Sequence, residues 1–218
     1  LYSGTYFTRT STSPSASSAV DVFYQFIDRN IEQSKLQTVV EIGCNDTYLL
    51  NKFKDDAEVL YGIDPILEDK DLELCDDNIH LIGDYFENIH SELPTANVDL
   101  IFSSHTLEHM VDPVSIIETA LNSGHDDTLF AFQFPGLEPL VRNARFDQVH
   151  NQHINYFSLS SVRYMLESLD AELVDFEYNF WHWGALMIAF RRRRRSESPQ
   201  TIQQVSNTTF DISMITSQ

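Results

Sequence analysis

The sequence lacks the features that mark several common protein classes. Only two of its 218 residues are cysteines, Cys44 and Cys75, and they do not form a C-x-x-C pair. This argues against a cysteine-based zinc cluster or a disulfide framework, and it suits a reducing cytoplasm. No apolar run approaches the ~20 residues needed to span a bilayer, and no signal-peptide pattern is present. We therefore predict a cytoplasmic protein without a membrane partner.

Basic residues are scarce as well. The formal net charge is −19, from 33 acidic and 14 basic residues, and five of the basic residues form the single run 191–195. A surface with so few positive charges repels a phosphate backbone. We therefore predict that nucleic acid is not a partner.

The length favours one α/β domain with short appendages. We expect a hydroxyl-rich N-terminal loop over residues 1–18, a main domain over 19–195 and a polar tail over 196–218, which we interpret as the start of a truncated element. Because the chain begins with Leu1, we interpret it as a fragment of a longer protein. Ser17 or Ser18 is expected to cap the first helix.

Glycine is missing where a dinucleotide-binding protein would need it. The β-branched run 39–42 predicts a buried parallel strand, Gly43 permits a sharp turn, and residues 48–53 predict the start of a helix. A dinucleotide site requires G-x-G-x-x-G at this turn, so that backbone amides can meet a pyrophosphate. Here Asn45 occupies the position of the second glycine.

Carboxylates surround this turn instead. Glu41 and Asp46 flank it, and Asp64 closes the next predicted strand, 59–63. Two acids would repel a pyrophosphate, but they suit a ligand that carries an ammonium and a sulfonium group, as S-adenosylmethionine does. Asp64 lies where it can hold two ribose hydroxyls. The ordered set Glu41, Gly43, Asp46 and Asp64 therefore predicts a methyltransferase with S-adenosylmethionine as its cofactor.

Two further strand ends carry polar residues. Asp84 follows the predicted third strand, 79–82, and either accepts a hydrogen bond from an adenine amino group or caps a turn or helix. Ser104 and His105 follow the fourth strand, next to the topological switch point where a substrate would meet the cofactor. We predict Ser104 as a cofactor contact, and His105 as either a lid or substrate contact or a structural histidine.

A metal site is the other interpretation of this loop. If the loop is helical, His105 and His109 share one face, as in a two-histidine metal site. The H-E-x-x-H order is absent, however, and the sequence shows no third ligand. We therefore predict no metal.

The remaining pattern completes a fold prediction. A fifth strand is expected over 128–134, a helix after Ser158 or Ser160, and an antiparallel strand pair over 171–178 and 183–190. The predicted fold is therefore α/β, with a Rossmann-like, seven-stranded, mostly parallel sheet and an antiparallel C-terminal strand pair.

Four segments together resemble a known family. Residues 41–46, 62–65, 105–109 and 146–158 occur in the order seen in class I S-adenosylmethionine-dependent methyltransferases of the sugar C-methyltransferase group, which act on nucleotide-linked keto-deoxysugars. The resemblance implies that the cofactor's methionine end is lined by Gly43, Asn45 and Asp46. It also implies that Asp64 holds the ribose and that Asp84 approaches the adenine.

The same resemblance implies a general base. His153 falls on the family histidine that removes a proton from the carbon beside a ketone, and an imidazole with a pKa of ~6.5 can accept a proton at neutral pH. His150, Asn151 and Gln152 replace the family's tyrosine, histidine and glutamate. O- or N-methylation therefore remains open beside C-methylation. The predicted catalytic residues are His153, His150, Gln152 and His105.

We accordingly predict methyl transfer to a small-molecule acceptor, in particular a sugar or nucleotide-sugar of a surface polysaccharide or secondary metabolite. The alternative is a catalytically impaired methyltransferase-like module that serves a larger assembly, which the replacements Asn151 and Gln152 favour. A nicotinamide-dependent oxidoreductase is disfavoured by the missing glycines and by the acids at the turn.

Overall fold

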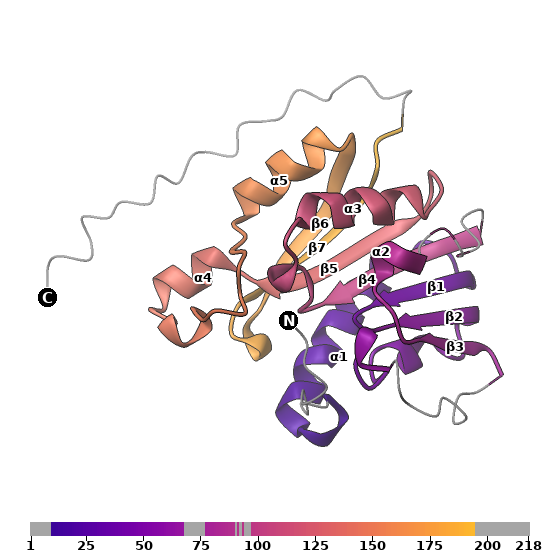
Figure 1. Cartoon of the computed structure of the whole chain (residues 1–218), viewed down its shortest axis with the longest axis horizontal. Helices are drawn as coiled ribbons and strands as arrows, with labels where there is room; N and C mark the ends of the chain where they lie inside the picture. The colour runs from indigo at the N-terminus through magenta and orange to yellow at the C-terminus, as the bar shows by residue number, and fades with distance from the viewer. Residues whose placement is uncertain (1–9, 68–76, 90, 92, 94–96, 195–218) are drawn as a thin grey trace, which may run out of the picture.

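The computed structural model describes residues 10–67, 77–89, 91, 93 and 97–194. Its centre is a seven-stranded sheet with the strand order β3-β2-β1-β4-β5-β7-β6 (Figure 1). The strands are β1 (Leu36–Ile42), β2 (Ala57–Ile63), β3 (Ile79–Ile82), β4 (Val98–Ser104), β5 (Leu129–Pro135), β6 (Ala171–Asn179) and β7 (Ala185–Arg192). The first five pair in parallel, and β7 runs antiparallel to both β5 and β6. The predicted fold class is confirmed.

The strand order reverses direction at β1. From β1 the chain moves outward through β2 to β3, and it then returns to the other side of β1 with β4. In the register, Ile42 lies beside Ile63 on one side and beside Ser103 on the other. The carboxyl ends of β1, β2 and β4 therefore open into one region, which is where ligands bind in sheets of this kind.

Each face of the sheet buries its own hydrophobic core. Val40 and Ile42 of β1 belong to one core, and Val39 belongs to the other, because alternate side chains of a strand point to opposite faces. The first core includes α3 (Pro113–Asn122) and α5 (Leu159–Ser168), and the second includes α1 (Pro14–Asp28). Figure 1 shows these helices on the two sides of the sheet. The central strands are therefore buried on both faces, which explains their nearly continuous apolar sequences.

The first helix begins earlier than the sequence analysis expected. Ser13, and neither Ser17 nor Ser18, is its N-cap residue: its side chain accepts a hydrogen bond from the amide of Ala16, and Pro14 occupies the first helical position. The loop expected over 1–18 is therefore shorter, because 3-10 helix η1 (Thr10–Thr12) and α1 occupy its second half. Residues 1–9 and the predicted tail over 196–218 lie outside the described part of the chain.

The helix expected after β1 is reduced to a short 3-10 helix, η2 (Leu50–Phe53). Two residues of the turn, Asn45 and Thr47, have positive φ, and β2 already begins at Ala57. In addition, Asp55 and Asp56 would place two negative charges at the C-terminal end of a longer helix, which the helix dipole disfavours.

The other elements are short, and each contributes at least one residue to the wall of the cavity described below. They are η3 (Pro65–Leu67), α2 (Phe86–Ile89), η6 (Leu107–His109), α4 (Leu137–Arg142), η7 (Phe146–Gln148) and η8 (Phe180–His182). Ser158, one of the two residues predicted as the cap of α5, is its N-cap and forms a reciprocal capping box with Ser161. Among the residues that the structure describes, no helix is both long and apolar enough to cross a membrane.

Candidate active site

A cavity of about 900 Å³ opens at the carboxyl ends of the parallel strands. Its volume is in the range of small-molecule binding sites. All eleven site residues predicted from the sequence line it, together with others: Glu41, Gly43, Asn45, Asp46, Asp64, Asp84, Ser104, His105, His150, Gln152 and His153. The structure therefore brings the acidic turn after β1 and the histidine-rich segment before α5 to the same cavity.

The turn after β1 requires glycine at position 43. Gly43 has a φ of +76°, and a Cβ atom placed there would lie 2.2 Å from Oγ1 of Thr106. The hydroxyl of Ser103 donates a hydrogen bond of 2.8 Å to the carbonyl oxygen of Ile42, just before the turn. The turn after β1 is thus in close contact with the loop after β4, where any side chain would push the two apart.

Asp64 connects the ends of β1 and β2. One of its carboxylate oxygens accepts a hydrogen bond of 2.9 Å from the amide of Asn45, and the other accepts one of 3.0 Å from the amide of Ile66. The residue is only 8% exposed. These two bonds hold the carboxylate at the cavity wall in a fixed orientation, which is what a two-point contact with a ribose requires.

Glu41 is a buried acid without a complete set of partners. Within the described residues its Oε2 atom has no hydrogen-bond partner. Burial raises the pKa of this carboxyl well above its usual value, and nearby Asp64 and Asp46 raise it further. A cationic group bound beside Glu41 would stabilise its ionised form. The acidic end of the cavity therefore fits a ligand with an ammonium or sulfonium group, as S-adenosylmethionine has.

Asp46 and Asp84 both accept hydrogen bonds within the protein. Asp46 accepts hydrogen bonds from the amides of Ser11, at 2.8 Å, and Tyr48, at 3.4 Å. Asp84 accepts from the amide of Tyr85, at 2.6 Å, and from the side chain of Asn88, at 2.7 Å. The turn-capping role considered for Asp84 is therefore present in the structure, and its predicted contact with adenine stays a prediction.

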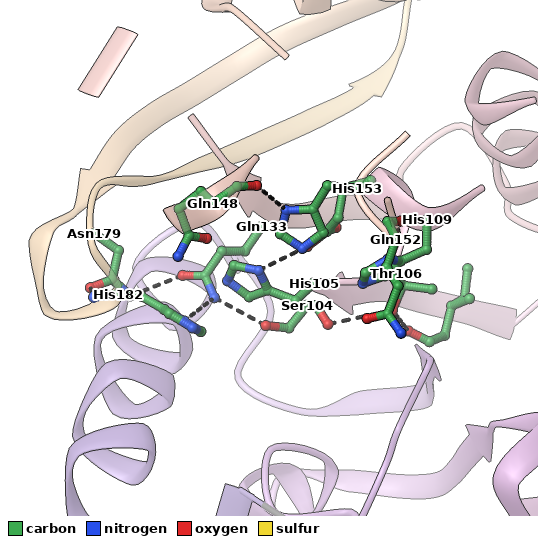
Figure 2. A network of polar contacts seen from close by, with 12 residues as sticks. Ser104, His105, Thr106, His109, Gln133, Gln148, Gln152, His153, Asn179 and His182 are labelled. Carbon is green, nitrogen blue, oxygen red and sulfur yellow. Dashed lines mark hydrogen bonds and ion pairs between the residues drawn. The ribbon is translucent and has the colours of Figure 1, made fainter. Parts of the chain in front are cut away.

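The opposite end of the cavity is built from two segments distant in sequence. The amides of Ile154 and Asn155 both donate to the carbonyl oxygen of Glu108, at 3.0 and 3.1 Å. The side-chain amide of Asn155 also donates to the carbonyl oxygen of Met110, at 2.6 Å. The segment before α5 is thereby attached to the loop after β4, and the side chains of both segments meet (Figure 2).

Backbone carbonyls fix the orientation of two histidines here. Nδ1 of His109 lies 2.8 Å from the carbonyl oxygen of Gln152, and Nδ1 of His153 lies 3.0 Å from that of Gln148 (Figure 2). A carbonyl oxygen only accepts hydrogen bonds, so both Nδ1 atoms carry the proton and both lone pairs are on Nε2.

His153 is neutral in this environment. Its ring lies 3.9 Å from the ring of His150 and 5.0 Å from the ring of His109, centroid to centroid. Burial lowers the pKa of His153, and the two histidines lower it too, whereas Glu108 acts in the opposite direction. The neutral ring can accept a proton at Nε2, which is the property that a general base needs.

Glu108 is the residue whose importance the sequence analysis missed. It is 0% exposed, its Oε1 atom lies 3.0 Å from Nδ1 of His105, and its Oε2 atom is buried without a hydrogen-bond partner in the described part of the chain. Burial raises the pKa of Glu108 to about 7, and the neighbouring histidines, His109 first, partly oppose that rise.

His105 links Glu108 to a second polar network. It has a φ of +55°, so it does not share a helical face with His109, and its ring lies 3.9 Å from the ring of His182. Burial lowers the pKa of His105 to about 3 and that of His182 to about 2, so both rings are neutral. The side-chain amide of Gln133 donates to the hydroxyl of Ser104, at 3.0 Å, and also lies 3.5 Å from Nδ1 of His182.

One residue of this network, Gln133, stands out in the sequence. Gln133 is the single polar side chain among the apolar residues of the 129–135 strand, and it is 1% exposed. Its Oε1 atom accepts a hydrogen bond of 2.9 Å from Asn179 at the end of β6 (Figure 2). A buried polar residue of this kind must have partners, so Gln133 could have been predicted as a site-supporting residue.

Comparison with known proteins agrees with this geometry. A curated relative, the C-methyltransferase NovU of Streptomyces niveus, is 23% identical over 184 residues, which are 79% of this chain and 42% of the relative. The chain thus spans less than half the length of that relative. Among solved structures, magnesium protoporphyrin IX methyltransferase of Synechocystis, with bound SAH, aligns with a TM-score of 0.59 at 11% identity, over 82% of this chain and 84% of the other.

A second structure, the plantazolicin methyltransferase BpumL in complex with a pentazolic desmethylPZN analog and SAH, aligns with a TM-score of 0.60 at 12% identity, over 84% of this chain and 86% of the other. At these identities the two structures support the fold alone, and the predicted resemblance to methyltransferases is confirmed by the match to a family model. Residues 19–175 match the methyltransferase domain family, which is most of the chain, and the protein therefore belongs to that family.

Proposed function

We propose that the protein transfers a methyl group from S-adenosylmethionine to a small-molecule acceptor, and that this acceptor is a sugar or nucleotide-sugar. The observation that carries the proposal is the single cavity that joins a buried acidic end, at Glu41 and Asp64, to a histidine-rich end, at His153. The likeness to a C-methyltransferase supports carbon as the acceptor atom, and oxygen remains the second possibility.

The acidic end is assigned to the cofactor. When bound, S-adenosylmethionine supplies an electrophilic methyl group on a positively charged sulfur. We assign Gly43, Asn45 and Asp46 to its methionine part, Asp64 to the ribose and Asp84 to the adenine. Gly43 lines the cavity at this turn, and the Oε2 atom of Glu41, which has no hydrogen-bond partner among the described residues, attracts the positive charge of the cofactor.

The histidine-rich end is assigned to the acceptor. Nε2 of His153 has the lone pair that can take a proton from a hydroxyl, or from the carbon beside a ketone. His150 and Gln152 lie on the same exposed segment and line the cavity, so we assign them to acceptor binding. His105 is held by Glu108 and its ring contacts the ring of His182, so we assign it to the wall of the acceptor site.

The experiment separates cofactor binding from turnover. The protein is incubated with S-adenosylmethionine and a panel of nucleotide-linked keto-sugars, and formation of S-adenosylhomocysteine is followed by chromatography. We expect product only when an acceptor is present. His153→Ala should keep cofactor affinity and lose turnover, whereas the matched variant His80→Ala, at an exposed position on β3, should keep both. Unchanged turnover in His153→Ala would remove His153 from the reaction.

A further inference from the structure

Three metal-ligating side chains converge at the acceptor end of the cavity. Glu108, His109 and His153 each offer one ligand atom, and these atoms all lie within 4.8 Å of one another. The three residues come from two segments, the loop after β4 and the segment before α5. Their proximity is therefore a product of the fold, and the sequence did not show it.

Each of the three side chains also makes a hydrogen bond through an atom other than the one that would bind the metal. The Nδ1 atoms of His109 and His153 are bonded to the carbonyl oxygens of Gln152 and Gln148, which leaves the lone pair of each ring on Nε2. The Oε1 atom of Glu108 is bonded to Nδ1 of His105. Histidine and carboxylate ligands of metals are oriented by this type of second hydrogen bond, which fixes the tautomer and the direction of the ligating atom.

An independent observation concerns the remaining oxygen of Glu108. The residue is 0% exposed, and its Oε2 atom has no hydrogen-bond partner among the described residues. A buried carboxylate oxygen without a partner is costly. A cation at the centre of the three residues would supply the missing partner.

We propose that Glu108, His109 and His153 form a binding site for a divalent transition-metal cation. Two imidazoles and one carboxylate, with the remaining positions open to the cavity, are a ligand set that zinc and iron(II) use in catalytic sites. Ligand bonds of about 2.1 Å place the ligands of a tetrahedral ion about 3.4 Å apart, so the atoms would close by at most about 1.4 Å on binding. This site reverses the prediction of no metal that the sequence spacing suggested.

The cation would change how the acceptor is activated. Bound to an acceptor hydroxyl, it lowers the pKa of that hydroxyl and orients its oxygen. It also occupies the lone pair with which His153 would act as a base in the metal-free protein. The metal-loaded protein therefore favours oxygen acceptors, which ionise on the metal. This inference goes beyond the proposed function and does not rest on it, because metal binding is measured without cofactor or acceptor.

The test is a titration of the full chain with Co²⁺ after removal of metals with EDTA and desalting. Visible absorption reports nitrogen and oxygen ligands around Co²⁺, and Zn²⁺ is then added as a competitor. We expect saturation at one Co²⁺ per chain and displacement by Zn²⁺. Glu108→Gln and His153→Gln should each weaken Co²⁺ binding by at least ~10-fold. The matched variant His80→Gln, outside the cluster, should bind as the unmodified protein does.

Two results would overturn the proposal: no saturable Co²⁺ binding by the unmodified protein, or binding that neither cluster variant weakens. Thermal melting of each variant checks folding. If the fully buried Glu108→Gln does not fold, the half-buried His153→Gln carries the test. S-adenosylmethionine affinity is measured on the same samples with and without metal. The affinity for S-adenosylmethionine should be the same with and without metal. If S-adenosylmethionine does not bind in either condition, that result counts against the proposed function and not against the metal site.

Discussion

The substitution Asp64→Asn gives the most informative test of the cofactor site. The carboxylate of Asp64 accepts hydrogen bonds from the amides of Asn45 and Ile66, and it lies at the cavity wall where the ribose is assigned. Asparagine has nearly the same shape, but it has no charge and only one oxygen. The variant therefore removes the charged two-point acceptor while the side-chain volume stays the same.

The expected size of the effect follows from hydrogen-bond energies. A hydrogen bond to a charged group contributes about 1.5–3 kcal/mol, roughly twice as much as a neutral one. Loss of one such contact corresponds to about 10–150-fold weaker binding. Because Asp64 is 8% exposed, solvent screens this interaction little. We therefore expect the Kd for S-adenosylmethionine to rise by about 10–150-fold.

The assay is isothermal titration calorimetry with S-adenosylmethionine at fixed pH and salt. Glu58→Gln is the matched control, because it removes the same charge from an exposed position of the same strand, β2, and it should bind normally. Melting curves check that the turn after β1 remains folded in both variants. A Kd for Asp64→Asn within about twofold of the unmodified value would refute the assignment of Asp64 to the ribose.

Three further predictions concern the turn and the buried ionisable groups. Gly43→Ala should lower the free energy of unfolding by about 1–3 kcal/mol in denaturant titrations, because its Cβ atom would meet Thr106 and its φ is positive; no change would contradict the close contact. Burial raises the pKa of Glu41 in the folded protein, so folding favours the protonated carboxyl. The stability that this group contributes is therefore full below its unfolded pKa and is lost as pH rises through its folded pKa. Glu41→Gln should therefore gain stability relative to the unmodified protein as pH rises, and an equal difference at all pH values would contradict this. Burial lowers the pKa of His182 to about 2, so the stability that its neutral ring contributes is present above pH ~6.5 and is lost as pH falls. His182→Gln should therefore flatten the acid-side slope of the free energy of unfolding against pH by up to about 1.4 kcal/mol per pH unit. An unchanged slope between pH 6 and 4 would count against a buried neutral ring.

The sequence predicted which residues gather at the acidic end of the cavity, because that end is built from short, local segments. The strand before Gly43, the turn and the acids Glu41 and Asp46 lie within eight residues, and strand periodicity places Asp64 at the neighbouring strand end. Parallel strands in a sheet with this order necessarily bring these positions together. The boundaries of the first helix were less accurate, because Ser13, Ser17 and Ser18 are all plausible caps and only the packing of the helix selects one.

The acceptor side could not be assembled from the sequence. Glu108 and His153 are far apart along the chain, and they meet because two amides of the later segment bind the carbonyl oxygen of Glu108. Similarly, His105 has a positive φ, so the helical spacing to His109 that suggested a shared face does not apply. Contacts made by irregular loops have no periodicity, and hydrophobic patterning contains no information about them.

The central claim is that acids at the ends of β1 and β2 select a positively charged methyl donor over an anionic dinucleotide. The most direct measurement is a pair of calorimetric titrations of the unmodified protein, one with S-adenosylmethionine and one with NADH, under the same buffer and salt. We predict saturable binding of S-adenosylmethionine at one molecule per chain and no detectable binding of NADH. Tighter binding of NADH, or no binding of S-adenosylmethionine, would contradict the claim.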